Sequence, residues 1–146
     1  MTEINIYLAG AISLYYKNNQ HEIAKKWRRE IARELNYWAQ DQDVKFKFYD
    51  PTIGGDWAVE KGLESNIFLT TNEYFLRKAD IVIVNMKDLH QSPGTIYELV
   101  WSKLNNKTII GYRYNKWINV PHVSSCFGYQ CGDQKEVVEL VKNMFV

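Results

Sequence analysis

Ala79-Asp80-Ile81-Val82-Ile83-Val84-Asn85 is the stretch that decides the fold. It is a nearly unbroken apolar run with β-branched residues, which is typical of a strand buried on both faces of a parallel sheet. Ser92-Pro93-Gly94-Thr95-Ile96-Tyr97-Glu98-Leu99 follows it and combines a loop with a helix start, so we expect Glu98 in the first helical turn. Open α/β sheets bind ligands at the carboxyl ends of their strands. The loop that begins at Ser92 is therefore predicted to border a ligand site, with Glu98 as the candidate catalytic residue.

The rest of the sequence predicts alternating strands and helices. Apolar or alternating runs predict strands at 4–10, 44–49 and 108–112, with 44–49 at an edge of the sheet. Apolar residues three or four positions apart predict helices at about 21–39, 59–78 and 137–144. The helix that starts within 92–99 is expected to continue to about 104. Loops are expected at 11–19, 50–57 and 113–132, the last ending in a short strand.

This order of elements predicts one domain over residues 1–146. The connections are too long for hairpins, so we expect parallel strands joined by right-handed crossovers. The predicted fold class is α/β, a three-layer sandwich with a mainly parallel five-stranded sheet, flavodoxin-like or Rossmann-like. Such a fold alone does not determine a function.

Charge and composition favour a small-molecule partner. The 18 Lys and Arg residues nearly balance 17 Asp and Glu residues, so the net charge of +1 gives no reason to expect a nucleic-acid polymer or a membrane surface as partner. No apolar run approaches the roughly 20 residues that span a bilayer. Two nearby cysteines, Cys126 and Cys131, and an N-terminus without a signal-like segment predict a cytoplasmic protein with free thiols.

Several residues in the predicted loops are candidate binding residues. Gly10 allows a ligand to approach closely, Ser13 and Lys17 offer donors to a phosphate or a sugar, and Trp57 offers a ring on which a base can stack. The alternative for Trp57 is that it covers the core or an interface. No cofactor is expected, since the sequence around Gly10 lacks the G-x-G-x-x-G spacing of nicotinamide-binding proteins. No metal site is expected either, because histidines and cysteines are scattered.

The segment around Glu98 also has an alternative, purely structural interpretation. Thr95-x-x-Glu98 satisfies the capping-box pattern, in which the two side chains bond the first free amides of a helix. Three features favour a ligand site instead: Pro93 and Gly94 keep the backbone tight and open, Ser92 adds a hydroxyl, and Tyr7 reaches the glutamate if the strands at 4–10 and 79–85 are neighbours.

Four segments together resemble the nucleoside 2-deoxyribosyltransferase family, which includes deoxyribonucleoside 5'-monophosphate N-glycosidases. They are Ile6-Tyr7-Leu8-Ala9-Gly10, Ala79-Asp80-Ile81-Val82-Ile83-Val84, the segment from Ser92 to Leu99, and Lys107-Thr108-Ile109-Ile110. Their order and spacing agree over roughly residues 4 to 112. The resemblance implies cleavage of the bond between a base and deoxyribose, with transfer to another base or to water.

The resemblance also implies roles for individual residues. Glu98 would be the nucleophile that forms a glycosyl-enzyme, and Tyr7 would hold it. Ser92 stands where transferases commonly carry an aspartate that binds the 5'-hydroxyl, which favours a 5'-monophosphate substrate. Ser124 or Ser125 resembles a serine that family members lend across a subunit boundary, so the resemblance implies a homo-oligomer with shared active sites.

One position departs from the family pattern. Asn72 replaces the aspartate that helps protonate the leaving base, and an amide cannot act as a general acid. Either Glu73 or Asp88 takes over this role, or the base is activated by other means, or the true counterpart is shifted by one residue. The remaining alternative is a nucleotide-binding or sequestering protein with weak catalysis.

Overall fold

The computed structural model describes residues 1–53 and 66–146, and it shows a five-stranded, all-parallel sheet. The strands are β1 (Thr2–Ala9), β2 (Val44–Tyr49), β3 (Ile81–Asn85), β4 (Thr108–Tyr112) and β5 (Tyr129–Cys131). Their order in the sheet is β2-β1-β3-β4-β5. The predicted α/β fold and the edge position of β2 are therefore confirmed.

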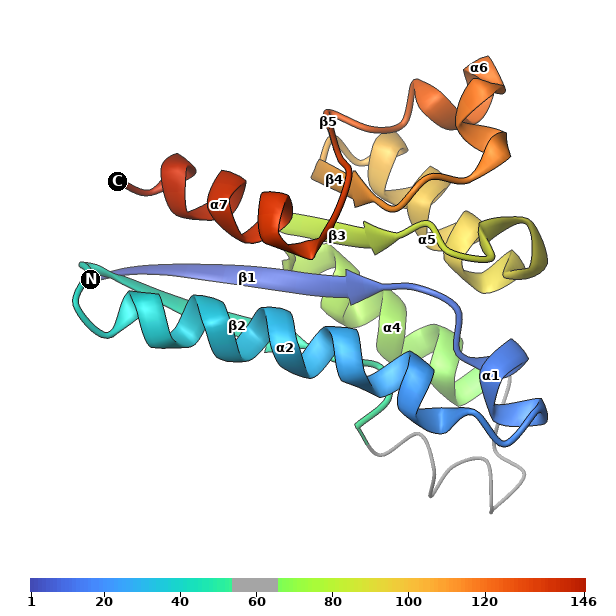
Figure 1. Cartoon of the computed structure of the whole chain (residues 1–146), viewed down its shortest axis with the longest axis horizontal. Coiled ribbons are helices and arrows are strands. Elements are labelled where there is room, and N and C mark those ends of the chain that lie inside the picture. Colours follow the sequence, from blue (N-terminus) through green and yellow to red (C-terminus); the bar gives the residue numbers. More distant parts are fainter. Residues whose placement is uncertain (54–65) are drawn as a thin grey trace.

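The longer helices cover both faces of the sheet. They are α2 (His21–Ala39), α4 (Asn66–Lys78), α5 (Pro93–Leu104) and α7 (Gln134–Met144). Short helical segments are α1 (Ser13–Lys17), η1 (Leu89–Gln91), η2 (Lys116–Asn119) and α6 (Pro121–Ser124). Figure 1 shows α2 and α7 over one face of the sheet and α4 and α5 over the other. Among the helices described, none combines the length and the apolarity needed to cross a bilayer.

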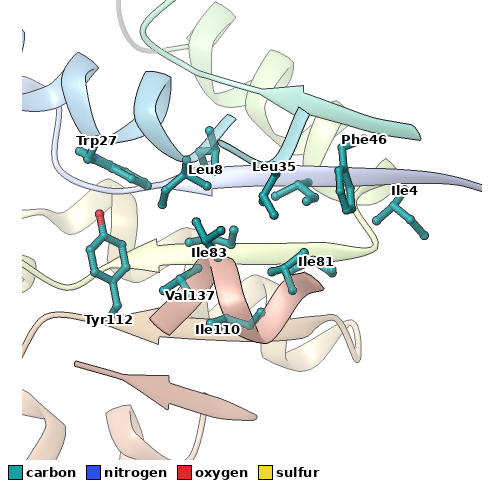
Figure 2. Packing of buried hydrophobic residues seen from close by; sticks show 14 of the residues in the cluster. Ile4, Leu8, Trp27, Leu35, Phe46, Ile81, Ile83, Ile110, Tyr112 and Val137 are labelled. Atoms are coloured by element: carbon teal, nitrogen blue, oxygen red, sulfur yellow. The ribbon is translucent and has the colours of Figure 1, made fainter. Parts of the chain in front are cut away.

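Each face of the sheet has its own core, because successive side chains of a strand point to opposite faces. Towards α2 and α7, Leu8, Ile83 and Ile110 pack with Trp27 and Val137, as Figure 2 shows. Towards α4 and α5, the alternate strand residues pack with helix residues in a second cluster: Tyr7, Ala9, Val82, Val84, Ile109, Leu76 and Leu99. Burial on both faces explains why these strands are apolar runs.

The carboxyl ends of the strands point to the side of the molecule on which α1 lies (Figure 1). β1 lies between β2 and β3, and its Tyr7 is aligned with Tyr49 of one and Val82 of the other. The strands at 4–10 and 79–85 are thus neighbours, which was the condition for Tyr7 to reach Glu98. At the end of β1, a side chain on Gly10 would meet Trp27 at 2.8 Å, so glycine allows α2 to approach the sheet closely.

The structure corrects the predicted boundaries in the loops. The loop 11–19 contains α1, and 113–132 contains η2 and α6 before the short strand β5. These helices have only four or five residues, too few for an apolar period to emerge. The helix start expected within 92–99 lies at Pro93, where proline suits the first helical position. The predicted helix start at about 59 lies outside the described residues.

Candidate active site

A cavity of about 380 Å³ opens at the carboxyl ends of the strands. It is bordered by α1 and the segment before it, by the loop after β2, by α4 and by the start of α5. The predicted site residues that line it are Gly10, Ser13, Lys17, Asn72, Ser92, Gly94 and Glu98. The structure thus brings together residues that are widely separated in the sequence.

Glu98 is the buried acid of this cavity, with 9% of the residue exposed. The Tyr7 hydroxyl donates a hydrogen bond to Glu98 Oε2. Burial raises the pKa of Glu98 to about 7, while the hydrogen bond from Tyr7 and the charge of Arg28 act in the opposite direction. At neutral pH the carboxyl is therefore present in both protonation states.

The expected place of Glu98 in the first helical turn is wrong. α5 begins at Pro93, its first turn holds no acidic residue, and Glu98 lies one turn further on. Thr95 is inside the helix rather than at its N-cap, so the capping-box alternative does not apply. The partial positive charge of a helix start falls off within the first turn, so it gives the anionic form of Glu98 little support. The carboxylate depends instead on Tyr7 and Arg28.

Tyr7 is fully buried in the core between the sheet and α5. Burial raises its pKa well above the usual value, and the charge of Glu98 raises it further, so Tyr7 remains a hydrogen-bond donor. Its ring lies 5.1 Å from that of Tyr49 on the neighbouring strand. The sheet register thus fixes the position of the Tyr7 hydroxyl.

Asn72 reaches the cavity from α4. The Tyr49 hydroxyl donates to Asn72 Oδ1 at 2.9 Å, which leaves the amide nitrogen as the group that Asn72 can offer to a ligand. Burial raises the pKa of Tyr49 to about 12, and the Glu98 charge adds to this effect. The Tyr49 phenol is therefore protonated at neutral pH and available to orient the amide.

The two suggested substitutes for the missing acid are engaged elsewhere. Glu73 accepts a hydrogen bond from Tyr97, and Asp88 accepts one from Tyr15 at 2.5 Å. Neither carboxylate lines the cavity in the part of the chain that the structure describes. Neither Glu73 nor Asp88 therefore supplies an acid to the described lining of the cavity.

The start of α5 forms one wall of the cavity. Ser92 is the N-cap residue, but its side chain bonds the Thr95 hydroxyl at 2.6 Å instead of a helix amide. The first N–H groups of a helix have no partner within it and attract anions. Gly94 has no atom within 4 Å of where a side chain would begin, so the wall is open here. Lys17 and His21 line the same cavity.

Two predicted residues are not part of this arrangement, and a third cannot be placed. Ser124 ends α6 and Ser125 follows it, and neither lines the cavity of this chain. Their predicted role across a subunit boundary stays a prediction. Trp57 lies outside the described residues.

Sequence reasoning missed Arg28 and Tyr49. Arg28 lies one position after Trp27 and three before Ile31, on the apolar side of α2, and it is fully buried. A charged residue on the apolar side of a helix is rarely buried without a partner, so this position in the sequence could have indicated a buried, paired arginine. Tyr49 gave no signal, because its contact with Asn72 depends on how β2 and α4 meet.

Solved structures similar to this chain include a transferase and a conserved protein. A 2-deoxyribosyltransferase from the psychrotolerant bacterium Bacillus psychrosaccharolyticus matches with a TM-score of 0.66 and 19% identity, over 92% of this chain and 90% of that chain. A conserved protein from Enterococcus faecalis V583 matches with a TM-score of 0.53 and 8% identity, over 98% and 99% of the two chains. No family model and no curated protein matches the sequence. At these identities the similarity shows the fold.

The raised pKa of Glu98 predicts a pH-dependent cost to stability. The folded state favours the neutral form of Glu98. The neutral carboxyl therefore contributes its full stability below pH 4.5, the ordinary pKa of a glutamate, and this contribution is lost as the pH rises through about 7. Glu98→Gln removes this dependence. Urea denaturation gives the free energy of unfolding of the variant and of the wild type at each pH. We expect the difference, variant minus wild type, to be larger at pH 8 than at pH 5 by up to about 3 kcal/mol.

Glu22→Gln is the control for this prediction, because it removes an exposed carboxylate whose pKa is lowered by its bond to Arg29. It should not reproduce the rise between pH 5 and pH 8. Equal curves for Glu98→Gln and the wild type would contradict the burial effect on Glu98.

Proposed function

We propose that this protein cleaves the N-glycosidic bond of 2'-deoxyribonucleosides or their 5'-monophosphates, with transfer of the sugar to another base or to water. The observation that carries the proposal is the Glu98 carboxyl, held by Tyr7 and facing a cavity of about 380 Å³. The similarity in fold to a 2-deoxyribosyltransferase and the resemblance of four sequence segments to that family support it.

In the proposed reaction, ionised Glu98 attacks C1' of the sugar. The new C1'–O bond forms as the C1'–N bond breaks, and the bonding electron pair leaves with the base. A second base or a water then attacks C1' and releases Glu98, so the sugar keeps its configuration. Tyr7 orients the attacking oxygen, and Asn72 donates a hydrogen bond to the departing base without transferring a proton.

The start of α5 favours a 5'-monophosphate. Ser92 carries no charge, whereas an aspartate at this position would repel a phosphate. The free amides of the helix start, together with Lys17 and Ser13, offer donors for phosphate oxygens. The proposed assembly is a homo-oligomer in which Ser124 or Ser125 completes the site of a neighbouring chain.

A second candidate function is nucleotide binding or sequestration with weak catalysis. Asn72 favours it, because an amide at this position cannot transfer a proton to the leaving base. A binding protein should be stabilised against heat by nucleotides that chromatography recovers intact. Release of free base during the same incubation identifies the enzyme.

The Glu98 variant tests the nucleophile. We expect Glu98→Gln to reduce base release by several orders of magnitude, because the attacking oxygen is lost. Chromatography of a deoxynucleotide incubated with and without an acceptor base would show free base and exchanged product. Glu73→Gln is the matched control and should retain activity, because Glu73 bonds Tyr97 outside the cavity. Normal turnover by Glu98→Gln excludes the assignment.

The Ser92 variants test the choice between nucleoside and monophosphate. Ser92→Asp brings a negative charge to the start of α5, so kcat/KM for a 5'-monophosphate should fall by about 10- to 100-fold, which corresponds to roughly 1.4 to 2.8 kcal/mol. The matching nucleoside should be affected much less. Ser92→Asn, which adds no charge, is the control. Equal losses for both substrates would argue against phosphate binding at Ser92.

The Asn72 variants test the missing proton donor. In Asn72→Asp, a carboxyl oxygen can still accept the Tyr49 hydrogen bond, and the protonated acid can serve the leaving base. We expect single-turnover rates at acidic pH to increase by about 100-fold or more, the usual effect of a general acid. Asn72→Ala should show no increase. If Asn72→Asp is no faster than the wild type, the base leaves without help from this position.

A further inference from the structure

Arg28 is a buried cation that the proposed chemistry does not use. It lies in the middle of α2, and its side chain has no exposed surface. Its guanidinium donates to the backbone carbonyls of Leu8 at 3.1 Å, of Gly10 at 3.0 Å and of Ala24. It lies 4.6 Å from the centre of the Trp27 ring. Desolvating a guanidinium is costly, so these contacts offset a large penalty.

The contacts of Arg28 lie where β1 and β2 end. The last aligned pair of these strands is Tyr7 with Tyr49, so the carbonyls of Leu8 and Gly10 lie beyond the paired region. Arg28 supplies a donor to each. On the side of β2, its Nε lies 3.7 Å from Asp50 Oδ1. The planar guanidinium of arginine, with its five N–H donors, suits this bridging better than the single ammonium group of lysine.

Both bridged segments lead directly into the cavity wall. Gly10 lines the cavity itself, and Pro51 lines it immediately after Asp50. Asp50 is fixed in turn, since its Oδ1 accepts hydrogen bonds from the backbone and the hydroxyl of Thr52 at 2.8 and 2.6 Å. A shift of Arg28 would therefore move two separate parts of the wall.

Arg28 also acts on the carboxyl of Glu98. Among the described residues, it is the cation whose charge lowers the pKa of Glu98. The other titratable groups described near Glu98 come from β1, β2, α1 and α2. Tyr7 of β1 bonds Glu98, and Tyr49 of β2 bonds Asn72 of α4. Lys17 of α1 and His21 of α2 line the same cavity as Glu98.

We propose that Arg28 is a positioning residue that joins the ends of β1 and β2 and places a buried positive charge behind the wall of the cavity that Glu98 lines. Its catalytic consequence rests on the proposed function, because ionised Glu98 is the nucleophile there. Its structural and electrostatic consequences do not depend on that function and are measurable without a substrate.

The test is a pH titration of the Glu98 carboxyl by carbon-13 NMR, with its signal assigned by its absence in Glu98→Gln. Arg28→Gln removes the charge but keeps an amide donor for the carbonyls. We expect it to raise the titration midpoint of Glu98 by about one unit or more, as loss of a nearby opposite charge does. Arg28→Lys should return the midpoint towards the wild-type value. Arg29→Gln, the same change at the exposed neighbouring position, should leave it unchanged.

A second variant keeps the proposal testable if Arg28→Gln does not fold. Asp50→Asn removes the acid that competes for Arg28 and leaves the bonds of Arg28 to the carbonyls, so the Glu98 midpoint should fall. An unchanged midpoint in Asp50→Asn and in any folded Arg28→Gln overturns the proposal. The proposal is also overturned if the Glu98 titration midpoint is as high in Arg28→Lys as in Arg28→Gln.

The same variants separate this proposal from the proposed function. If the wild type cleaves deoxynucleotides, the acid limb of its kcat/KM profile should move with the NMR midpoint in Arg28→Gln. Midpoints that shift as expected in a protein that releases no base support the role of Arg28 and reject the enzyme. If the wild type cleaves deoxynucleotides but the Glu98 midpoint is the same with and without Arg28, the enzyme is supported and the role of Arg28 is rejected.

Discussion

The hydrogen bond from Tyr7 to Glu98 is the interaction on which the site depends. It joins β1 to α5, so the Glu98 carboxyl is held by the packing of the helix on the sheet rather than by groups of α5 itself. The bond needs β1 beside β3, with β3 buried on both faces, and it needs α5 packed against that sheet. A rigid core therefore fixes the one acid of the described cavity lining, which is how a reactive group keeps its geometry without a flexible loop.

Burial of Glu98 raises its pKa and makes its ionised form costly in free energy. A carboxylate taken out of water loses hydration, and this raises the pKa of Glu98 to about 7. The Tyr7 donor and the Arg28 charge limit that rise. Arg28 is itself buried and is offset by carbonyl oxygens and Asp50, so its charge is shared among several partners. The site is thus a balance of desolvated charges spread over β1, α2, α5 and the end of β2.

The sequence predicted the parts of the fold whose burial is continuous. The run 81–85 is apolar because both of its faces are covered, and 44–49 alternates until its end because it is an edge strand. The starting point of α5 was misplaced, although Ser92 followed by Pro93 is a helix-start pattern, because Thr95 and Glu98 offered a second one. The sequence also located part of the cavity lining, including Gly10, Ser92 and Glu98. It could not reveal Arg28 or the pairing of Tyr49 with Asn72, because these depend on which side chains meet across elements.

A phosphate bound at Ser92 would act against the ionisation of Glu98, and this constrains the proposed chemistry. Six residues separate the two along α5, which corresponds to about 9 Å at the helical rise. A unit negative charge at that distance disfavours the Glu98 anion by on the order of 2 kcal/mol at an effective dielectric constant of about 20. The positive groups available are the start of α5 and Lys17 in the cavity lining, and Arg28, which is buried behind Gly10 of that lining. A site that binds an anion and ionises an acid within one cavity needs positive charge near both groups, and these residues supply it.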